Sequence, residues 1–172
     1  MSETNFTEQW AEDFAKDQQK LELEEMLAKA DNIVLGFVAS TGATGAIPIP
    51  FADAPLLIAQ QVAMMGAINA VFHITVSKDV LKSLAMAAIG VSGTTIIGKT
   101  VATSLIKLIP GAAAAGTAAA LTLALGKAYI GICKAIKMGR LDLNELSQKK
   151  GLELFKRNFL DEMKSGKKKK NK

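Results

Sequence analysis

Residues Gly93 to Thr100, GTTIIGKT, match the phosphate-binding pattern G-x-x-x-x-G-K-[ST] of nucleotide-binding loops. A working loop of this kind needs a buried strand before it, a helix N-terminus at the phosphates and a later Asp for magnesium. Residues 83–91 are instead rich in Ala and Met, and no acidic residue follows Thr100 until Asp142. No base-reading [NT]-K-x-D motif is present. We therefore expect Lys99 at a helix surface and no bound nucleotide.

The other side chains that could act as nucleophiles, general acids or bases, or metal ligands also have no suitable partner in the sequence. The chain has one histidine, His73, and one cysteine, Cys133, so neither a disulfide within the chain nor a metal site is expected. Between residues 33 and 132 the carboxylates are Asp53 and Asp79, and both stand where helices are expected to start. We predict a protein that is not an enzyme, with no catalytic residue and no cofactor. Because MSETNFTEQW is unlike a secretory signal, we expect a cytoplasmic protein.

Charge is distributed unevenly along the chain. Residues 1–32 carry nine acidic residues and three lysines, a net charge of −6. Residues 33–132 carry a net charge of +3, and residues 133–172 carry +8. This asymmetry can orient the protein on an anionic surface, or it can let the two ends of the chain pair with each other. The sequence leaves both interpretations open.

The composition favours closely packed helices. Aromatic residues make up only 5% of the chain, so Ala, Leu, Ile, Val and Met must fill the core. We predict an all-α fold, a compact multi-helix bundle with Ala/Gly-rich central helices. One domain is expected over residues 1–163, followed by a disordered, lysine-rich tail over 164–172. Within the domain, 1–31 is an acidic amphipathic helix, 32–140 an apolar helical core and 141–163 a basic amphipathic helix.

The apolar pattern predicts individual helices. The first runs from about Thr7 to Ala30, and a second, short helix ends near Ile47. Further helices are expected over residues 54–77, from the N-cap Ser77 to about Ala88, over 95–109, from the uncharged stretch 108–126 on through residue 139, and over 144–163. Two stripes on the first helix are expected in the core: Trp10, Phe14 and Leu21, then Leu23, Met26, Leu27, Ala30, Ile33, Val34 and Phe37.

The stretch from Ala54 to Ser77 has no charged residue over 24 positions, which exceeds the roughly 20 needed to cross a bilayer. However, Gln61, Asn69 and His73 are separated by multiples of four residues and form a polar seam. A seam of this kind faces water or forms a hydrogen-bonded network inside a bundle. Farther along, Ala112, Gly116 and Ala120 are small residues that let helices approach closely.

Lysines are concentrated at the C-terminus. Next to a basic amphipathic helix, they can bind an anionic leaflet, although such tails are commonly just solvated. Nucleic-acid binding is disfavoured because stacking aromatic residues are missing nearby. The predicted membrane-binding residues are Lys164, Lys167, Lys168, Lys169, Lys170 and Lys172.

Two stretches carry a family resemblance. PIPFADAPLLIAQQVAM, residues 48–64, and IKLIPGAAAAGTAAALTLALGKAYI, residues 106–130, resemble the signatures of a helical domain of unknown function. That domain is found beside Era-like or Ras-like GTPase domains and in YcjF-type bacterial inner-membrane proteins. The second stretch departs from the family pattern after Pro110, where Gly and Val are usual. The resemblance implies an all-helical, membrane-associated module that works beside a GTPase, and it implies no catalytic residues.

These observations lead to three hypotheses. The first is a non-enzymatic bacterial module at the cytoplasmic face of the inner membrane, acting beside a GTPase partner or as a homo-oligomer. The second is a soluble, self-assembling scaffold whose exposed apolar faces are buried against identical subunits. The third is a bundle that opens an apolar hairpin around Pro110 into membranes as a pore former.

Overall fold

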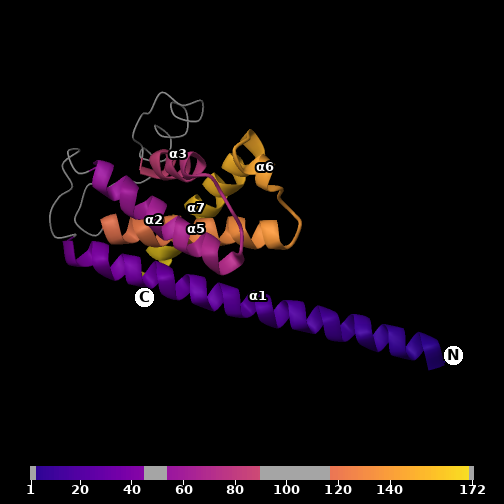
Figure 1. Ribbon diagram of the computed structural model, residues 1–172. Helices are drawn as coiled ribbons and strands as arrows, with labels where there is room; N and C mark the ends of the chain where they lie inside the picture. Colours follow the sequence, from indigo (N-terminus) through magenta and orange to yellow (C-terminus); the bar gives the residue numbers. More distant parts are fainter. Residues whose placement is uncertain (1–2, 45–53, 90–116, 171–172) are drawn as a thin grey trace.

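The computed structural model describes residues 3–44, 54–89 and 117–170, and these residues fold as helices without a strand (Figure 1). The predicted all-α class is therefore confirmed for the described part of the chain. The segment Gly93–Thr100 that matches the phosphate-loop pattern, the expected helix over 95–109 and the hairpin around Pro110 lie outside the described residues. The helices are α1 (Glu3–Thr44), α2 (Ala54–Phe72), α3 (Lys78–Ile89), α5 (Thr117–Lys137), α6 (Leu143–Leu146) and α7 (Lys149–Lys170).

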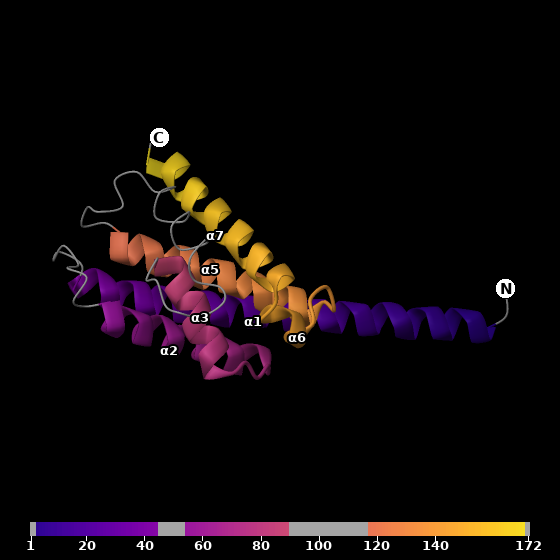
Figure 2. The same ribbon diagram turned by 90° about the horizontal axis from the view of Figure 1, so that it is seen from above.

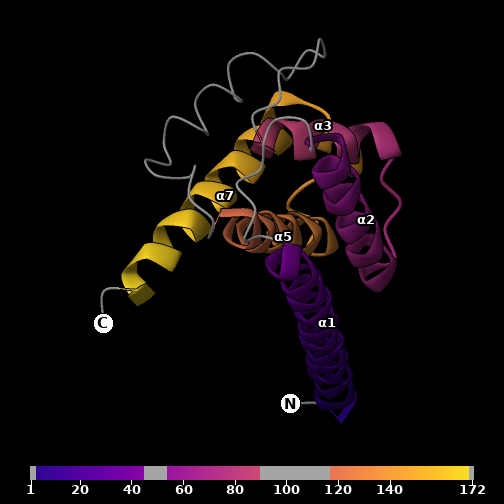
Figure 3. The same cartoon turned by 90° about the vertical axis from the view of Figure 1, so that its left-hand side faces the viewer.

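Helix α5 lies at the centre of the bundle. It packs against α1, α2 and α7, and α3 covers α2 on the side away from α1 (Figures 1 and 3). Ala124, Ala128 and Tyr129 of α5 are buried together with Leu125 and Ile132. Such a helix is apolar around most of its surface because it has neighbours on several sides.

Glycines of α5 permit two of these contacts. A Cβ atom added at Gly126 would lie 2.5 Å from Cγ2 of Val34 on α1. A Cβ atom added at Gly131 would lie 2.6 Å from Nδ2 of Asn158 on α7. Small residues were expected to bring helices together, and the observed close approaches occur at these two glycines. Ala112 and Gly116 lie outside the described residues.

Helix α1 differs from the prediction. Instead of ending near Ala30, it continues as one 42-residue helix, about 63 Å long at 1.5 Å per residue. Its second half packs on α5 and α2, and its first half extends past the end of the bundle (Figure 2). Met26, Ala30 and Val34 are buried, as predicted.

The predicted burial of the first stripe of α1 is wrong. Trp10, Phe14 and Leu21 are 63%, 53% and 55% exposed, because this half of the helix has no neighbouring helix in the described part of the chain. We call residues 8–25, whose side chains are exposed or nearly so, the arm. The stripe is amphipathic in sequence, but no helix of residues 54–89 or 117–170 packs against it.

Helix α2 is shorter than the expected 54–77 segment. It ends at Phe72 with a Schellman motif, in which Ile74 N–H donates to the Asn69 carbonyl (3.1 Å) and His73 N–H to the Ala70 carbonyl (3.3 Å). His73 has a φ of 53°, the left-handed conformation that this motif requires. Ser77 then caps α3, as predicted, because its Oγ accepts a 3.4 Å hydrogen bond from Val80 N–H.

The C-terminal region forms two helices instead of one. The short helix α6 is followed by α7, with Ser147 and Gln148 between them. Phe155 and Phe159 are buried on one face of α7. The sequence suggested a disordered tail from residue 164, whereas the backbone of α7 is helical to Lys170.

Candidate functional site

Two of the three residues of the polar seam form a network inside the bundle. Gln61 Nε2 donates a 2.9 Å hydrogen bond to Thr122 Oγ1, and Tyr129 O–H donates a 2.7 Å hydrogen bond to Asn69 Oδ1. Gln61, Asn69 and Thr122 are all buried. The bundle interior is therefore the correct alternative for Gln61 and Asn69. His73 lies beyond the end of α2, and its side chain is exposed.

This network does not activate a nucleophile. Burial raises the pKa of the Cys133 thiol to about 12, and the thiol lies 3.9 Å from Asn69 Oδ1. Burial, and then the neighbouring Cys133, raise the pKa of Tyr129. Both groups therefore stay protonated near neutral pH. The network joins α2 to α5, and the geometry supports a structural role for it.

Among the described residues, no group of three or more His, Cys, Asp or Glu side chains is arranged to hold a metal ion. The candidate phosphate-binding residue Lys99 lies outside the described residues. The sites that the structure offers are therefore surfaces and grooves, of which two stand out.

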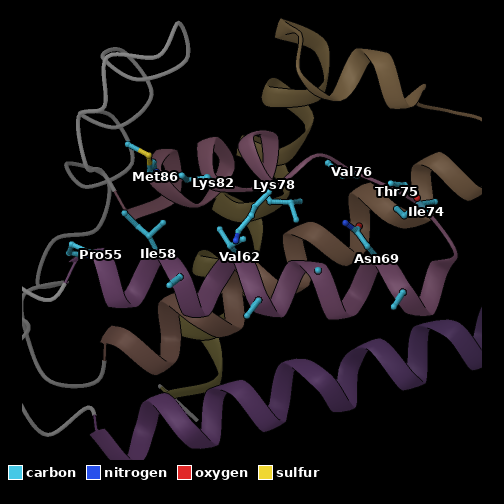
Figure 4. A pocket seen from close by; sticks show the side chains of 15 residues that line it. Pro55, Ile58, Val62, Asn69, Ile74, Thr75, Val76, Lys78, Lys82 and Met86 are labelled. Carbon is cyan, nitrogen blue, oxygen red and sulfur yellow. The ribbon is translucent and has the colours of Figure 1, made fainter.

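The first groove lies between α2 and α3 and has a volume of about 940 Å³ (Figure 4). This is at the upper end of the range of about 300–1,000 Å³ that is usual for ligand pockets. The side chains that line it are mostly apolar, and two lysines, Lys78 and Lys82, come from α3. Its apolar lining includes Ile58, Val62, Ile74, Val76, Leu81 and Met86.

The second groove lies between α5 and α7 and is lined by charged residues, with a volume of about 940 Å³. Two of its cations are neutralised, because Lys127 pairs with Asp31 (2.8 Å) and Lys150 with Glu145 (2.8 Å). Within the described part of the chain, no ion pair is formed by three further cations, Lys134, Arg140 and Arg157. The groove also contains the acidic residues Glu153, Asp161 and Glu162.

Two exposed apolar side chains follow α5 in the chain, Met138, which lines this second groove, and Leu143, which begins α6. Met138 is 42% exposed and Leu143 is 39% exposed. Gly139 turns the chain here with a φ of 66°, in a second Schellman motif. We call Lys134, Met138, Arg140, Leu143 and Arg157 the basic tip. Sequence reasoning missed these residues, although Arg140 and Leu143 flank a visible helix boundary.

The lysines predicted to bind membranes occupy the other end of α7. Lys164, Lys167, Lys168, Lys169 and Lys170 belong to the last turns of this helix, and Lys172 lies outside the described residues. Figures 1 and 2 place this end of α7 far from α6, where the basic tip lies. Of the cations in the basic tip, only Arg157 belongs to α7, whereas Lys134 lies in α5 and Arg140 in the connection to α6, so the two groups come from different parts of the fold.

One helix of the described part, over Pro55–Phe72, is long and apolar enough to cross a membrane. The bundle buries 44% of this window, including Gln61 and Asn69. Comparison of the chain with family models, with curated proteins and with solved structures found no match in any of the three.

Proposed function

We propose that the protein is a non-enzymatic helical module that attaches to an anionic membrane surface on the cytoplasmic side. There it would act beside a GTPase partner or with further copies of itself. The observation that carries the proposal is the basic tip, where three cations that form no ion pair among the described residues line one groove together with the exposed side chain of Met138. The similarity of residues 48–64 and 106–130 to the GTPase-associated domain supports the choice of partner.

Electrostatics supports attachment through α7 and the end of α5. Residues 133–172 carry a net charge of +8, and each Lys or Arg close to an anionic leaflet contributes about 1 kcal/mol. Met138 and Leu143 can enter the headgroup layer while the neighbouring cations contact lipid phosphates. The acidic arm belongs to α1, which packs on a different side of α5 from α7 (Figure 3).

The packing of α2 favours surface attachment over a membrane span. If α2 crossed a bilayer alone, Gln61 and Asn69 would lose their hydrogen bonds to Thr122 and Tyr129. Unpaired polar groups in hydrocarbon cost several kcal/mol each. In the proposed mode, the bundle keeps this helix packed.

Flotation with lipid vesicles tests the proposal. We expect the full chain to float with vesicles that contain phosphatidylglycerol and not with pure phosphatidylcholine, and binding should fall as salt rises. The variant Lys134→Glu/Arg140→Glu/Arg157→Glu should lose most binding, and so should a chain ending at Ser165. A matched control, Lys16→Glu/Lys20→Glu/Lys29→Glu, changes the net charge equally on α1 and should still bind. Failure of the unmodified chain to bind anionic vesicles would contradict the proposal.

A soluble, self-assembling scaffold is the second candidate function. The exposed stripe of Trp10, Phe14 and Leu21 on the arm favours it, because a monomer gains nothing from leaving these side chains in water. Light scattering in the absence of detergent and lipid would measure the copy number. If the protein forms a discrete oligomer and does not bind vesicles, self-assembly rather than membrane attachment is its main function.

A further inference from the structure

The arm of α1 and the groove between α2 and α3 are complementary in chemistry. The arm presents an apolar stripe flanked by acids, and the groove presents an apolar floor with lysines. We propose that the arm of one copy of the protein docks in the α2–α3 groove of a second copy. This inference goes beyond membrane attachment and uses a different part of the molecule.

The apolar stripe of the arm is arranged for docking. Trp10, Phe14 and Leu21 are spaced by four and seven residues and therefore lie on one face of the helix. The rings of Trp10 and Phe14 stack with their centroids 5.6 Å apart and their planes inclined by 16°. A stacked pair on a rigid helix loses little conformational freedom when it is buried.

The negative charge of the arm determines which surface of a second copy can bind it. Residues 8–25 contain seven acidic residues and two lysines, so two arms repel each other. The α2–α3 groove instead carries Lys78 and Lys82 beside apolar side chains such as Val62 and Leu81. The docking of an amphipathic helix in an apolar groove is a common recognition mode. The second groove, between α5 and α7, has cations but a more polar lining.

The arm does not reach the groove of its own chain. α1 is continuous from Glu3 to Thr44, and its second half is held against α5 by contacts such as Val34 to Gly126. The arm leaves the bundle along that same axis, away from α2 and α3 (Figures 1 and 2). The occupant is therefore the arm of a second copy.

Trp10 is the only tryptophan of the chain, so its fluorescence reports the arm directly. In the absence of lipid, we expect its emission to shift to shorter wavelength as protein concentration rises, because docking buries the indole. Light scattering should show the mass increase over the same concentration range. Emission and mass that do not change with concentration would overturn the proposal. So would a blue-shifted Trp10 in a monomer, since that would mean that the arm is buried within its own chain.

Charge exchange tests the pairing of surfaces. The variant Lys78→Glu/Lys82→Glu should raise the protein concentration at the midpoint of self-association by at least about tenfold, because the acidic arm then meets glutamates in the groove. The control Lys137→Glu/Lys149→Glu changes two exposed lysines outside this groove and outside the basic tip, has the same net charge and should behave as the unmodified chain. Mixing the Lys78→Glu/Lys82→Glu chain with an Asp13→Lys/Asp17→Lys chain should restore association. Equal effects of the two lysine pairs, or no restoration on mixing, would overturn the assignment. Vesicle binding plays no part in these measurements, so membrane attachment and arm docking fail separately.

Discussion

The hydroxyl group of Tyr129 on α5 donates a 2.7 Å hydrogen bond to Oδ1 of Asn69 on α2, and both side chains are buried. These residues are 60 positions apart in sequence, so the hydrogen bond defines how the two helices face each other. The thiol of Cys133, one helical turn after Tyr129, lies 3.9 Å from the same oxygen. Three polar groups thus share one small region of an otherwise apolar interface.

Asn69→Leu is expected to destabilise the protein by about 1–3 kcal/mol, because the Tyr129 hydroxyl is left buried without its acceptor. Tyr129→Phe also loses the hydrogen bond, and the double variant Asn69→Leu/Tyr129→Phe should cost less than the sum of the two. Urea unfolding of all four proteins gives the coupling free energy. Additive effects would show that this hydrogen bond does not couple α2 to α5.

Gly126→Ala is expected to destabilise the protein by about 1–3 kcal/mol, because the added Cβ would meet the Val34 side chain at 2.5 Å. Gly36→Ala is the matched control, since an added Cβ there has nothing within 4 Å and the residue is exposed. That control should stabilise the helix by up to about 1 kcal/mol. Thermal unfolding measures both, and Val34→Ala should partly rescue Gly126→Ala.

His73→Gly is expected to stabilise the protein by about 1 kcal/mol, because His73 has a φ of 53° and glycine adopts this conformation without strain. Gly139 occupies the same place in the Schellman motif that ends α5, with a φ of 66°. Gly139→Ala should therefore destabilise by a similar amount. Urea unfolding of the two variants measures both effects, and we expect the free energy of unfolding to rise in His73→Gly and to fall in Gly139→Ala.

Alkaline pH is expected to destabilise the fold through Cys133. The folded state raises the pKa of its thiol from 9.0 to about 12, so the contribution of this group is fully present below pH 9 and is lost as pH rises toward 12. Between pH 9 and 12, the titration of one thiol lowers the free energy of unfolding by at most about 1.4 kcal/mol per pH unit. Urea unfolding between pH 8 and 11 should show a shallower decline in Cys133→Ala. An unchanged slope would show that the thiol is not buried as described.

Local features of the chain were predictable from the sequence. Ser77 caps α3 as expected, and the apolar spacing of Met26, Ala30 and Val34 identified a buried helix face. The sequence also identified the lysines at the C-terminus as candidate membrane-binding residues, and their binding to a membrane stays a prediction. The basic tip was not visible, because the sequence does not show that Lys127 pairs with Asp31, whereas Lys134 and Arg157 form no ion pair within the described part of the chain.

The sequence by itself determined that the chain forms helices, since helix period, composition and caps act over a few residues. Only the tertiary structure decided which apolar faces are buried. Trp10, Phe14 and Leu21 have the same amphipathic spacing as the buried stripe of α1, yet they remain exposed. The physical reason is that burial requires a second surface at that place, and the helices that the structure describes pack against the other half of α1 (Figure 2).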